Sequence, residues 1–440
     1  MQAVLIFLLL TGATPAHSIG FLERVEKAAK EAWGYGARNF THWAVRPGLA
    51  EFKQNFTAIT VFSHQDAVGT NISCFRIPAI VQTSSGTILA FAEARGRFNH
   101  PWYNDTCADC SSLGIALKRS VDGGQTWSTL MWAVPPNFGA GAAGPHRNSG
   151  GNPVAVWDAQ RKRVLLHFVR GVSATGSCLP GNSNWQVASE DEGVTWGPPY
   201  DISKFLGNFV GALPGPGSGA VQLGASGRLL FNAHYGTAER SSGAVVVYYS
   251  DDGGTTFSMM RFPASFGRMD ESTMAETPSG HLVINMRNDP STSGCPGGAS
   301  DPSCQVRAVA RSKDGGETWS GITFDTALPD SLCQASIGLV ANTTIFFNPA
   351  MHTMRNLPTL RFSDDGGLTW RKSVMVADSF ADYSAIVNGA LMYDMRTSGS
   401  SVGGVLWGSC SQPVPFRLWC TPVELLKSSF WNIGFTRFQL

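Results

Sequence analysis

The sequence has few charged residues and almost no excess of either sign. Charged side chains make up 15% of its 440 residues, and the formal net charge is +1. A protein surface that binds nucleic acid or another polyanion carries a clear positive excess. The composition therefore argues against that class of partner and leaves room for a local cationic pocket only.

Long apolar runs and linkers are also missing. Beyond the N-terminus no apolar run approaches the ~20 residues that a helix needs to span a bilayer, and no Pro-rich or charged stretch marks a second domain. With 49 glycines and 13 tryptophans, the composition fits one large β domain of many short strands joined by tight turns.

The N-terminus predicts export. Ala3 to Leu10 is an apolar run followed by the small, turn-prone residues TGATPAHS, a pattern typical of a signal peptide over residues 1–18. No basic residue precedes the run, so an uncleaved anchor is the alternative. Five glycosylation sequons support a secretory-pathway protein: Asn39, Asn55, Asn71, Asn104 and Asn342.

One segment after this leader has the pattern of an amphipathic helix. Phe21 to Trp33 carries apolar residues at helical spacing, and Gly34-Tyr35-Gly36 ends it. We expect it in an extension over residues 19–56 that packs on the outside of the domain or mediates association.

Nine cysteines fit an oxidising compartment. Cys107 and Cys110 have a C-x-x-C spacing, but no second C-x-x-C or histidine pair accompanies them, so a loop disulfide is a better interpretation than zinc or redox chemistry. The odd number requires at least one cysteine to be free or to pair between chains. Two further pairs are close enough in sequence to close single loops: Cys295 with Cys304, and Cys410 with Cys420.

An eight-residue pattern, S-x-D-x-G-x-T-[WF], occurs five times. The pattern suits a self-contained hairpin turn, in which the Asp carboxylate accepts backbone N–H groups, Gly takes a positive φ and the aromatic ring packs under the loop. The intervals of 69, 61, 62 and 51 residues suit a blade of four strands, so the repetition predicts a β-propeller. The copies start at Ser120, Ser189, Ser250, Ser312 and Ser363.

Strand-like segments fill these intervals. Runs such as TAITVF, FRIPAIVQ, AVVVYYSDD and HLVINMR are separated by turn residues, and long alternations with helices are absent. This favours an all-β fold over a doubly wound α/β fold. The regions before the first copy and after the last make six blades the natural count, and we assign residues 57–440 to a six-bladed propeller.

The repeats resemble the Asp boxes of the sialidase superfamily, and Phe75-Arg76-Ile77-Pro78 matches that family's FRIP motif upstream of the first box. FRIPAIVQTSSGTILAFAEAR looks like the opening of animal sialidases, especially the lysosomal type, and the resemblance covers roughly Asn71 to Tyr383. Asp boxes also occur in propellers without hydrolase function and usually lie away from the active site. The resemblance therefore assigns them to the scaffold, and function has to come from other residues.

The resemblance implies three arginines that bind the carboxylate of sialic acid. Guanidinium groups suit this task because they stay charged and form planar, bidentate pairs with carboxylates. Arg76 of the FRIP motif matches the first, Arg287 in LVINMR the second and Arg355 in HTMRNLPTLRFS the third. Arg361 is nearer the fifth repeat and is interpreted as structural.

The resemblance also implies a tyrosine nucleophile. The substrate's own carboxylate would repel an anionic nucleophile, whereas a neutral phenol activated by a nearby acid avoids this repulsion. Tyr383 in FADYSAIVNG matches the family's tyrosine, and Glu271, sixteen residues before Arg287, matches its activating glutamate. Glu276 is the competing candidate, but it lies beside the turn TPSG and is interpreted as exposed surface.

The acid that protonates the leaving group belongs, in the family, to the loop before the strand that enters the first Asp box. Here this loop is RGRFNHPWYNDTCADCSSLG, which contains Asp105 and Asp109. We prefer Asp109, which lies seven residues before Ala116, because Asp105 overlaps the Asn104 sequon and a glycan beside a catalytic acid is unfavourable.

Further positions match the family's pocket. Arg95 at the end of AFAEAR corresponds to an arginine near the carboxylate or the glycerol side chain of the substrate. His234 and Tyr235 in FNAHYG lie where related enzymes place pocket aromatics.

One position departs from the family pattern. Sialidases commonly hold the FRIP arginine with a glutamate after the tyrosine, in a context like L-Y-E, where this chain has Gly408 in VLWGSC. Either another acid such as Asp394 substitutes, or Arg76 is held less firmly.

As a whole, the resemblance implies an exo-α-sialidase that cleaves terminal sialic acids from glycoproteins, glycolipids or oligosaccharides, with retention and without a metal or organic cofactor. The alternatives are a lectin-like propeller with weak or no catalysis, which the missing glutamate favours, and a trans-sialidase, which shares the same catalytic residues. We expect a lysosomal or extracellular location, no nucleic-acid partner, and a homo-oligomer or a stabilising partner protein.

Overall fold

The computed structural model describes residues 56–96, 98–100, 103–105, 107, 112–136, 147–172, 183–235, 244–260, 269–288, 301–352, 355–377, 379–410 and 431–440. The predicted leader and the predicted helix from Phe21 to Trp33 lie outside the described residues. Within the described part no helix is long and apolar enough to cross a membrane.

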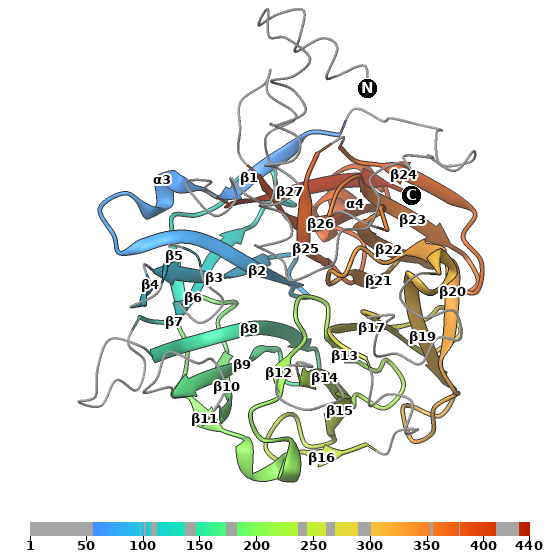
Figure 1. The fold of residues 1–440 in the computed structure, drawn as a ribbon, viewed down its shortest axis with the longest axis horizontal. Helices are drawn as coiled ribbons and strands as arrows, with labels where there is room; N and C mark the ends of the chain where they lie inside the picture. Colours follow the sequence, from blue (N-terminus) through green and yellow to red (C-terminus); the bar gives the residue numbers. More distant parts are fainter. Residues whose placement is uncertain are drawn as a thin grey trace, which may run out of the picture. The chain divides into compact units, whose positions relative to one another are not determined.

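The described residues form a six-bladed β-propeller, which confirms the predicted fold class. Each blade is an antiparallel sheet, and the blades follow one another around a common centre (Figure 1). The first three blades consist of β2 (Ile72–Gln82), β3 (Ile88–Gly96), β6 (Ser112–Ser120) and β7 (Met131–Val134); β8 (Arg147–Asp158), β9 (Arg163–Val172), β10 (Ser183–Ser189) and β11 (Tyr200–Asp201); and β12 (Leu213–Pro214), β13 (Ala220–Gln222), β14 (Leu229–Tyr235), β15 (Ala244–Ser250) and β16 (Ser258–Met259).

The other three blades continue the same order. They consist of β17 (Ser272–Glu276), β18 (Leu282–Met286), β19 (Val306–Ser312) and β20 (Thr323–Pro329); β21 (Ser336–Val340), β22 (Thr343–Pro349), β23 (Pro358–Ser363) and β24 (Lys372–Met375); and β25 (Ala381–Ile386), β26 (Val402–Cys410), β27 (Trp431–Gln439) and β1 (Ala58–Phe62). The first strands of the blades contact one another around the centre. A separate hairpin, β4 (Phe98–His100) with β5 (Tyr103–Asp105), follows β3, and short helices are α3 (His64–Ala67), α4 (Met392–Ser398), η1 (Ser203–Phe205), η2 (Gly207–Phe209) and η5 (Pro302–Cys304).

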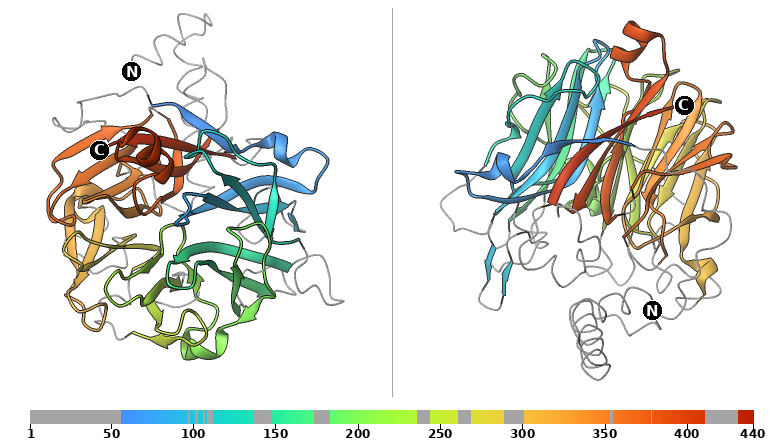
Figure 2. Two further views of the ribbon diagram at one scale, coloured as in Figure 1. Left: turned by 180° about the vertical axis from the view of Figure 1, so that it is seen from behind. Right: turned by 90° about the horizontal axis from the view of Figure 1, so that it is seen from above.

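The sixth blade combines strands from both ends of the described chain. Its outer strand β1 pairs antiparallel with β27, with Ala58 opposite Thr436. Figure 2 shows β1, in blue, beside the red strands of the last blade. This pairing closes the ring, because the strand that precedes the first blade in the sequence belongs to the last blade.

Apolar side chains fill the interfaces between neighbouring blades. Between the sixth and first blades, for example, Phe75 and Ile80 pack with Leu406 and Phe435. Similar clusters of buried residues occupy each of the other interfaces in the described part. Since strand side chains alternate between the two faces, both faces of each blade contribute to this core.

The repeated eight-residue segments form turns between the last two strands of each of the first five blades. In the first of these repeat turns, Asp122 Oδ1 accepts the Thr126 N–H at 2.9 Å, Ser120 Oγ accepts the Gly124 N–H at 2.8 Å, and Gly124 has a φ of 82°. The sixth blade has no such turn because its last two strands, β27 and β1, are distant in sequence. This accounts for five repeats in six blades.

The aromatic residue that ends each repeat turn packs toward the preceding blade. Trp127 contacts Phe435 of β27 with ring centroids 5.5 Å apart, and Trp196 contacts Phe91 of β3 at 5.8 Å. We predicted that the ring packs under its own loop; the structure adds a contact to the neighbouring blade. Each repeat turn therefore also stabilises an interface between blades.

Candidate active site

The predicted site residues that the structure describes lie at the end of the blades that is opposite to the repeat turns. In the fourth blade, Leu282 at the start of β18 pairs with Ser312, where a repeat turn begins. The other end of β18 leads into Arg287, and β17 begins directly after Glu271. The strands thus separate the repeat turns at one end of the blades from the predicted site residues at the other, as we expected from the sequence.

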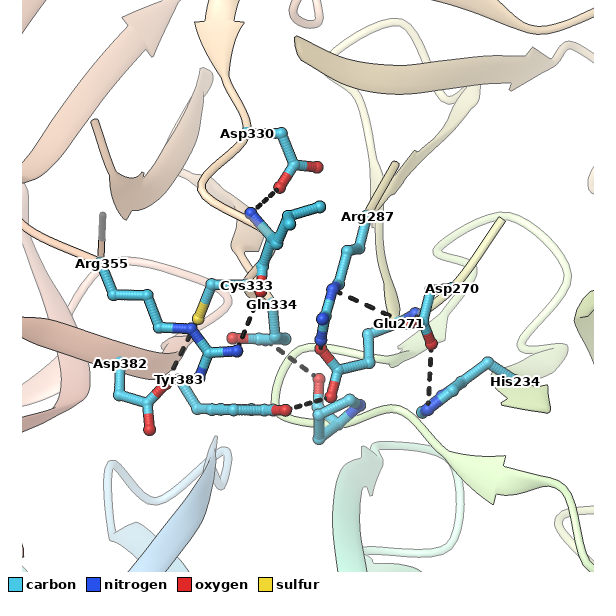
Figure 3. Close-up of polar contacts among 12 residues, drawn as sticks. His234, Asp270, Glu271, Arg287, Asp330, Cys333, Gln334, Arg355, Asp382 and Tyr383 are labelled. Atoms are coloured by element: carbon cyan, nitrogen blue, oxygen red, sulfur yellow. Dashed lines mark hydrogen bonds and ion pairs between the residues drawn. The ribbon is translucent and has the colours of Figure 1, made fainter. Parts of the chain in front are cut away.

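Two of the three predicted carboxylate-binding arginines share one acid. The Asp382 carboxylate accepts a hydrogen bond from Arg76 Nη2 through Oδ2. It accepts a second one from Arg355 Nη1 at 2.7 Å through Oδ1 (Figure 3). Arg355 also donates from Nη2 to the Leu332 carbonyl at 2.9 Å. The Asp382 side chain is 2% exposed, whereas those of Arg76 and Arg355 are 16% and 23% exposed. The acid is therefore buried behind two arginines that keep some contact with solvent.

The remaining predicted arginine, Arg287, lies beside two other acids. Its Nη1 donates to Glu271 Oε2 at 2.9 Å, and its Nε lies 3.6 Å from Asp270 Oδ2. Asp270 Oδ1 is in turn 3.5 Å from His234 Nε2 (Figure 3). Burial raises the pKa of Asp270, but the charge of Arg287 is the first of several effects that together lower it below its usual value. Asp270 was not predicted, and its place directly before Glu271 was the only signal for it.

Tyr383 connects the two groups of residues. Its hydroxyl donates a hydrogen bond to Glu271 Oε1 (Figure 3). Burial and the negative charge of Glu271 raise the pKa of Tyr383 well above its usual value, so the resting phenol keeps its proton. The guanidinium carbons of Arg76 and Arg355 each lie 5.8 Å from the centroid of the tyrosine ring.

A β-bulge lets two consecutive residues of β25 face this site. The register between β25 and β26 shifts by one residue, so that Asp382 and Tyr383 together oppose Gly408. Regular alternation would send neighbouring side chains to opposite faces of the sheet, whereas a bulge re-aims a side chain. The bulge explains how the acid directly before the tyrosine reaches the arginines.

Positive φ values occur beside both of these arginines. Ile77, which follows Arg76, has a φ of 53°, and Leu332, whose carbonyl accepts from Arg355, has a φ of 54°. A left-handed conformation costs such residues about 1–3 kcal/mol and persists only where the surrounding structure fixes it. Backbone strain is thus present in the segments that hold the arginine pair.

A group of buried polar residues supports the segment around Leu332. Arg307 is fully buried, pairs with Asp330 at 3.0 Å and donates to the Cys333 carbonyl at 2.8 Å. The Cys333 thiol lies 3.3 Å from Asp382 Oδ1 and donates to it. Burial raises the pKa of this thiol, so it remains a donor. Cys333 is a free cysteine, in agreement with the odd number in the sequence.

Arg95 is buried at the base of the loop that was predicted to carry the acid. It donates from Nε to Glu93 Oε2 at 2.7 Å and from Nη1 to the Cys107 carbonyl at 3.1 Å. We predicted Arg95 in the substrate pocket; its side chain is 2% exposed and supports this loop. Asp105 belongs to β5 and its side chain is not described, and Asp109 lies outside the described residues.

The disulfide at this loop differs from the predicted one. Cys107 is bonded to Cys74, at a sequence separation of 33 residues, and not to Cys110. The sequence spacing was misleading because β2 and β3 pair with Cys74 opposite Arg95, which brings Cys74 next to the loop after β3. The bond joins this loop to the strand that contains Arg76.

The acid beside Arg76 is also not the one that we named. Asp394 lies on α4 and pairs with Arg437, whereas Asp382 pairs with Arg76. Sequence reasoning missed Asp382 because it directly precedes Tyr383, and regular strand alternation would turn the two side chains apart.

The two competing candidates of the sequence analysis lie elsewhere. Arg361 is buried within the fifth blade and donates to Asn348 Oδ1 at 2.9 Å. Glu276 accepts the Gly224 N–H at 3.0 Å, at the end of β17 that is remote from Glu271. Tyr235 has no described side chain.

No metal-binding cluster accompanies these residues in the described part of the chain, since no three His, Cys, Asp or Glu side chains there are placed to hold an ion. The acids of the site are instead paired with arginines or with Tyr383.

The chain resembles several known proteins. A family model described as a BNR repeat-like domain matches residues 131–392. A sialidase of Bacteroides fragilis is 31% identical over 323 residues, which cover 68% of this chain and 54% of that protein, so the chain spans about half the length of this relative. An exo-alpha-sialidase of Arthroderma benhamiae is 31% identical over 329 residues, which cover 68% of this chain and 69% of that protein.

A solved structure shares the fold over most of both chains. The intramolecular trans-sialidase of Ruminococcus gnavus superposes with a TM-score of 0.63 at 16% identity, covering 87% of this chain and 97% of that one. The family model spans more than half of this chain, and the Arthroderma relative matches it over more than two thirds of its own length. The chain therefore belongs to the sialidase superfamily.

Proposed function

We propose that this protein is an exo-α-sialidase that removes terminal sialic acids from glycoproteins, glycolipids or oligosaccharides with retention of configuration. The observation that carries the proposal is the hydrogen bond from Tyr383 to Glu271 beside Arg76, Arg287 and Arg355.

In this proposal the three arginines bind the carboxylate of the sugar. This carboxylate is attached to the anomeric carbon, so a bidentate grip on it also fixes the reacting carbon. Arg76 and Arg355 lie at equal distances from the Tyr383 ring, which supports a bound carboxylate close to the tyrosine.

The first chemical step is attack by Tyr383. Its Oη forms a bond to the anomeric carbon while its proton passes to Glu271, and the bond to the leaving oxygen breaks as that oxygen takes a proton from Asp109. Because the pKa of Tyr383 is raised, little phenolate exists beforehand, so a base has to take the proton during the attack. Glu271 is hydrogen-bonded to that hydroxyl.

The second step releases the sugar. Asp109, now a carboxylate, takes a proton from water as the water oxygen attacks the anomeric carbon, and the bond to Tyr383 breaks as Glu271 returns the proton to the phenol. Two inversions at the same carbon give net retention. The assignment of Asp109 rests on the family resemblance, while its loop is anchored by Arg95 and by the disulfide at Cys107.

The test is release of methylumbelliferone from its α-sialoside by the wild type and by Tyr383→Phe, between about pH 4 and about pH 7. We expect wild-type turnover and a loss of on the order of 10³-fold or more in kcat for the variant. A folded wild type that binds sialic acid without turnover would refute the hydrolase and leave the lectin-like alternative. That alternative loses its main support, since Asp382 supplies a carboxylate beside Arg76 although position 408 has no glutamate.

Transfer is the second candidate, because the Ruminococcus gnavus protein with the same fold is an intramolecular trans-sialidase. Mass spectrometry of the products from an oligosaccharide substrate decides between the two. Free sialic acid supports hydrolysis, whereas an anhydro sugar or a sialylated acceptor supports transfer.

A further inference from the structure

A single buried carboxylate holds two arginines of the proposed clamp. Each oxygen of Asp382 accepts from a different guanidinium, Oδ2 from Arg76 and Oδ1 from Arg355. A carboxylate has a fixed spacing between its oxygens, so this bridge sets the distance between the two guanidinium groups. Arg76 lies on β2 of the first blade and Arg355 lies shortly before β23 of the fifth, so no local structure could set that distance.

The surroundings of Asp382 keep it charged and in place. Burial raises its pKa, but Arg76 and Arg355 are the leading causes that lower it below its usual value. The Cys333 thiol donates a further hydrogen bond to Oδ1 at 3.3 Å. Asp382 is therefore a buried anion that accepts its hydrogen bonds from protein groups with fixed positions.

The strand opposite leaves room for this acid. Gly408 on β26 faces the bulge, and a Cβ atom built on it would lie 3.4 Å from Asp382 Cβ and 3.7 Å from the Tyr383 carbonyl oxygen. These are ordinary contact distances, and the φ of Gly408 is not in the left-handed region. A side chain at position 408 would therefore extend beside the Asp382 carboxylate.

We propose that Asp382 is a positioning residue that sets the separation of Arg76 and Arg355 for the substrate carboxylate. From β25 it holds Arg76 in the way that a glutamate at position 408 would hold it from β26. The bulge in β25 makes this exchange possible, because it turns the residue before Tyr383 into the site. The inference rests on the proposed function, since it concerns the same arginines and the same substrate.

The first test compares Asp382→Asn with the wild type and with Asp394→Asn. Asparagine keeps the shape and removes the charge, so we expect KM to rise about 30-fold or more and kcat/KM to fall on the order of 100-fold, as for a buried charge pair that loses one partner. kcat should change less than KM, because Tyr383 and Glu271 are untouched and the clamp acts on bound substrate and transition state alike. Asp394→Asn removes a buried acid on α4 that pairs with Arg437 on β27 and lies beside the first repeat turn. Because that turn is at the opposite end of the blades from the site, this variant should leave both constants within about twofold of the wild type.

The second test moves the acid from position 382 on β25 to position 408 on the opposite strand, β26. Asp382→Ala/Gly408→Glu should recover at least about tenfold of the kcat/KM lost in Asp382→Ala, whereas Asp382→Ala/Gly408→Gln, of the same size without the charge, should recover none. Thermal unfolding of each variant separates loss of binding from loss of folding. Equal kcat/KM values for these two double variants, both folded, would overturn the proposal.

Binding of sialic acid is measured in addition to turnover, so that failure of the proposed function can be distinguished from failure of the role proposed for Asp382. Calorimetry with free N-acetylneuraminic acid gives Kd for the wild type and for Asp382→Asn, and we expect a weakening of about tenfold or more. An inactive wild type would refute the proposed hydrolysis, but a weaker Kd in the variant would still support the role of Asp382. The same KM and the same Kd in Asp382→Asn and the wild type would refute that role.

Discussion

At the scale of single residues, the site separates the proposed proton-transfer pair, Glu271 and Tyr383, from one charge bridge at Asp382. Glu271 accepts from the Tyr383 hydroxyl through Oε1 and from Arg287 through Oε2. Asp382 contacts the other two arginines. The three arginines are thus held by acids with different tasks, and substitutions at Glu271 and Asp382 should affect different kinetic constants.

Glu271→Gln should lower kcat by about 10²- to 10⁴-fold, because an amide cannot take the proton that Tyr383 loses. Steady-state kinetics with the methylumbelliferyl α-sialoside measures this. Glu276→Gln is the matched control, since Glu276 is on the same segment but contacts the Gly224 backbone, and it should leave kcat within about twofold. A larger loss at Glu276 than at Glu271 would show that the base has been assigned to the wrong residue.

At the scale of elements, the repeat turns are built from charged hydrogen bonds that depend on pH. In the third turn, burial raises the pKa of Asp252, but bonds from Thr256, Ser250 and Thr255 lower it to about 2. Asp365 in the fifth turn has a pKa of about 2 for similar reasons. In an unfolded chain an aspartate has a pKa of about 3.9. These turns therefore stabilise the fold fully above about pH 4 and lose that contribution as the pH falls toward about 2.

Asp252→Asn should accordingly lower Tm most at pH values above about 4, and the difference from the wild type should shrink toward about pH 2, where Asp252 itself becomes protonated. Thermal unfolding followed by circular dichroism over this range is the measurement. Asp251→Asn changes the charge at the neighbouring position, whose side chain is exposed and pairs with Arg228, and should have only a small effect. A difference in Tm for Asp252→Asn that does not vary with pH would contradict the assignment of stability to the ionised turn.

At the scale of the whole propeller, stability depends on closure of the ring between the sixth and first blades. Phe62 of β1 is fully buried and its ring lies 5.2 Å from that of Phe75 on β2. The contact joins the outer strand of the last blade to the first blade. Because the interface between the sixth and first blades joins the two ends of the described chain, loss of this contact weakens closure of the ring.

Phe62→Ala should lower the free energy of unfolding by about 3–5 kcal/mol, the usual cost of removing a fully buried phenylalanine side chain. Urea denaturation followed by tryptophan fluorescence measures the change. Thr60→Ala in the same strand removes an exposed side chain and should cost less than about 0.5 kcal/mol. Similar costs for the two variants would mean that β1 does not close the ring.

The sequence by itself determined the blade architecture and most of the candidate site. Each repeat turn depends on contacts between residues at most four positions apart, such as Asp122 with Thr126, so its pattern is visible in eight residues. Arg76, Arg287, Arg355, Tyr383 and Glu271 could be identified because each belongs to a short motif at a fixed place between repeats. The structure brings all five together.

Only the tertiary structure decided which groups support these residues. Asp382 reaches Arg76 because a bulge in β25 shifts the register by one residue, and a one-residue shift decides which face a strand side chain occupies. Cys107 bonds to Cys74 because β2 and β3 pair side by side, which no local spacing encodes. Both depend on the register in which neighbouring strands pair, and the energies that fix this register come from the packed blade as a whole.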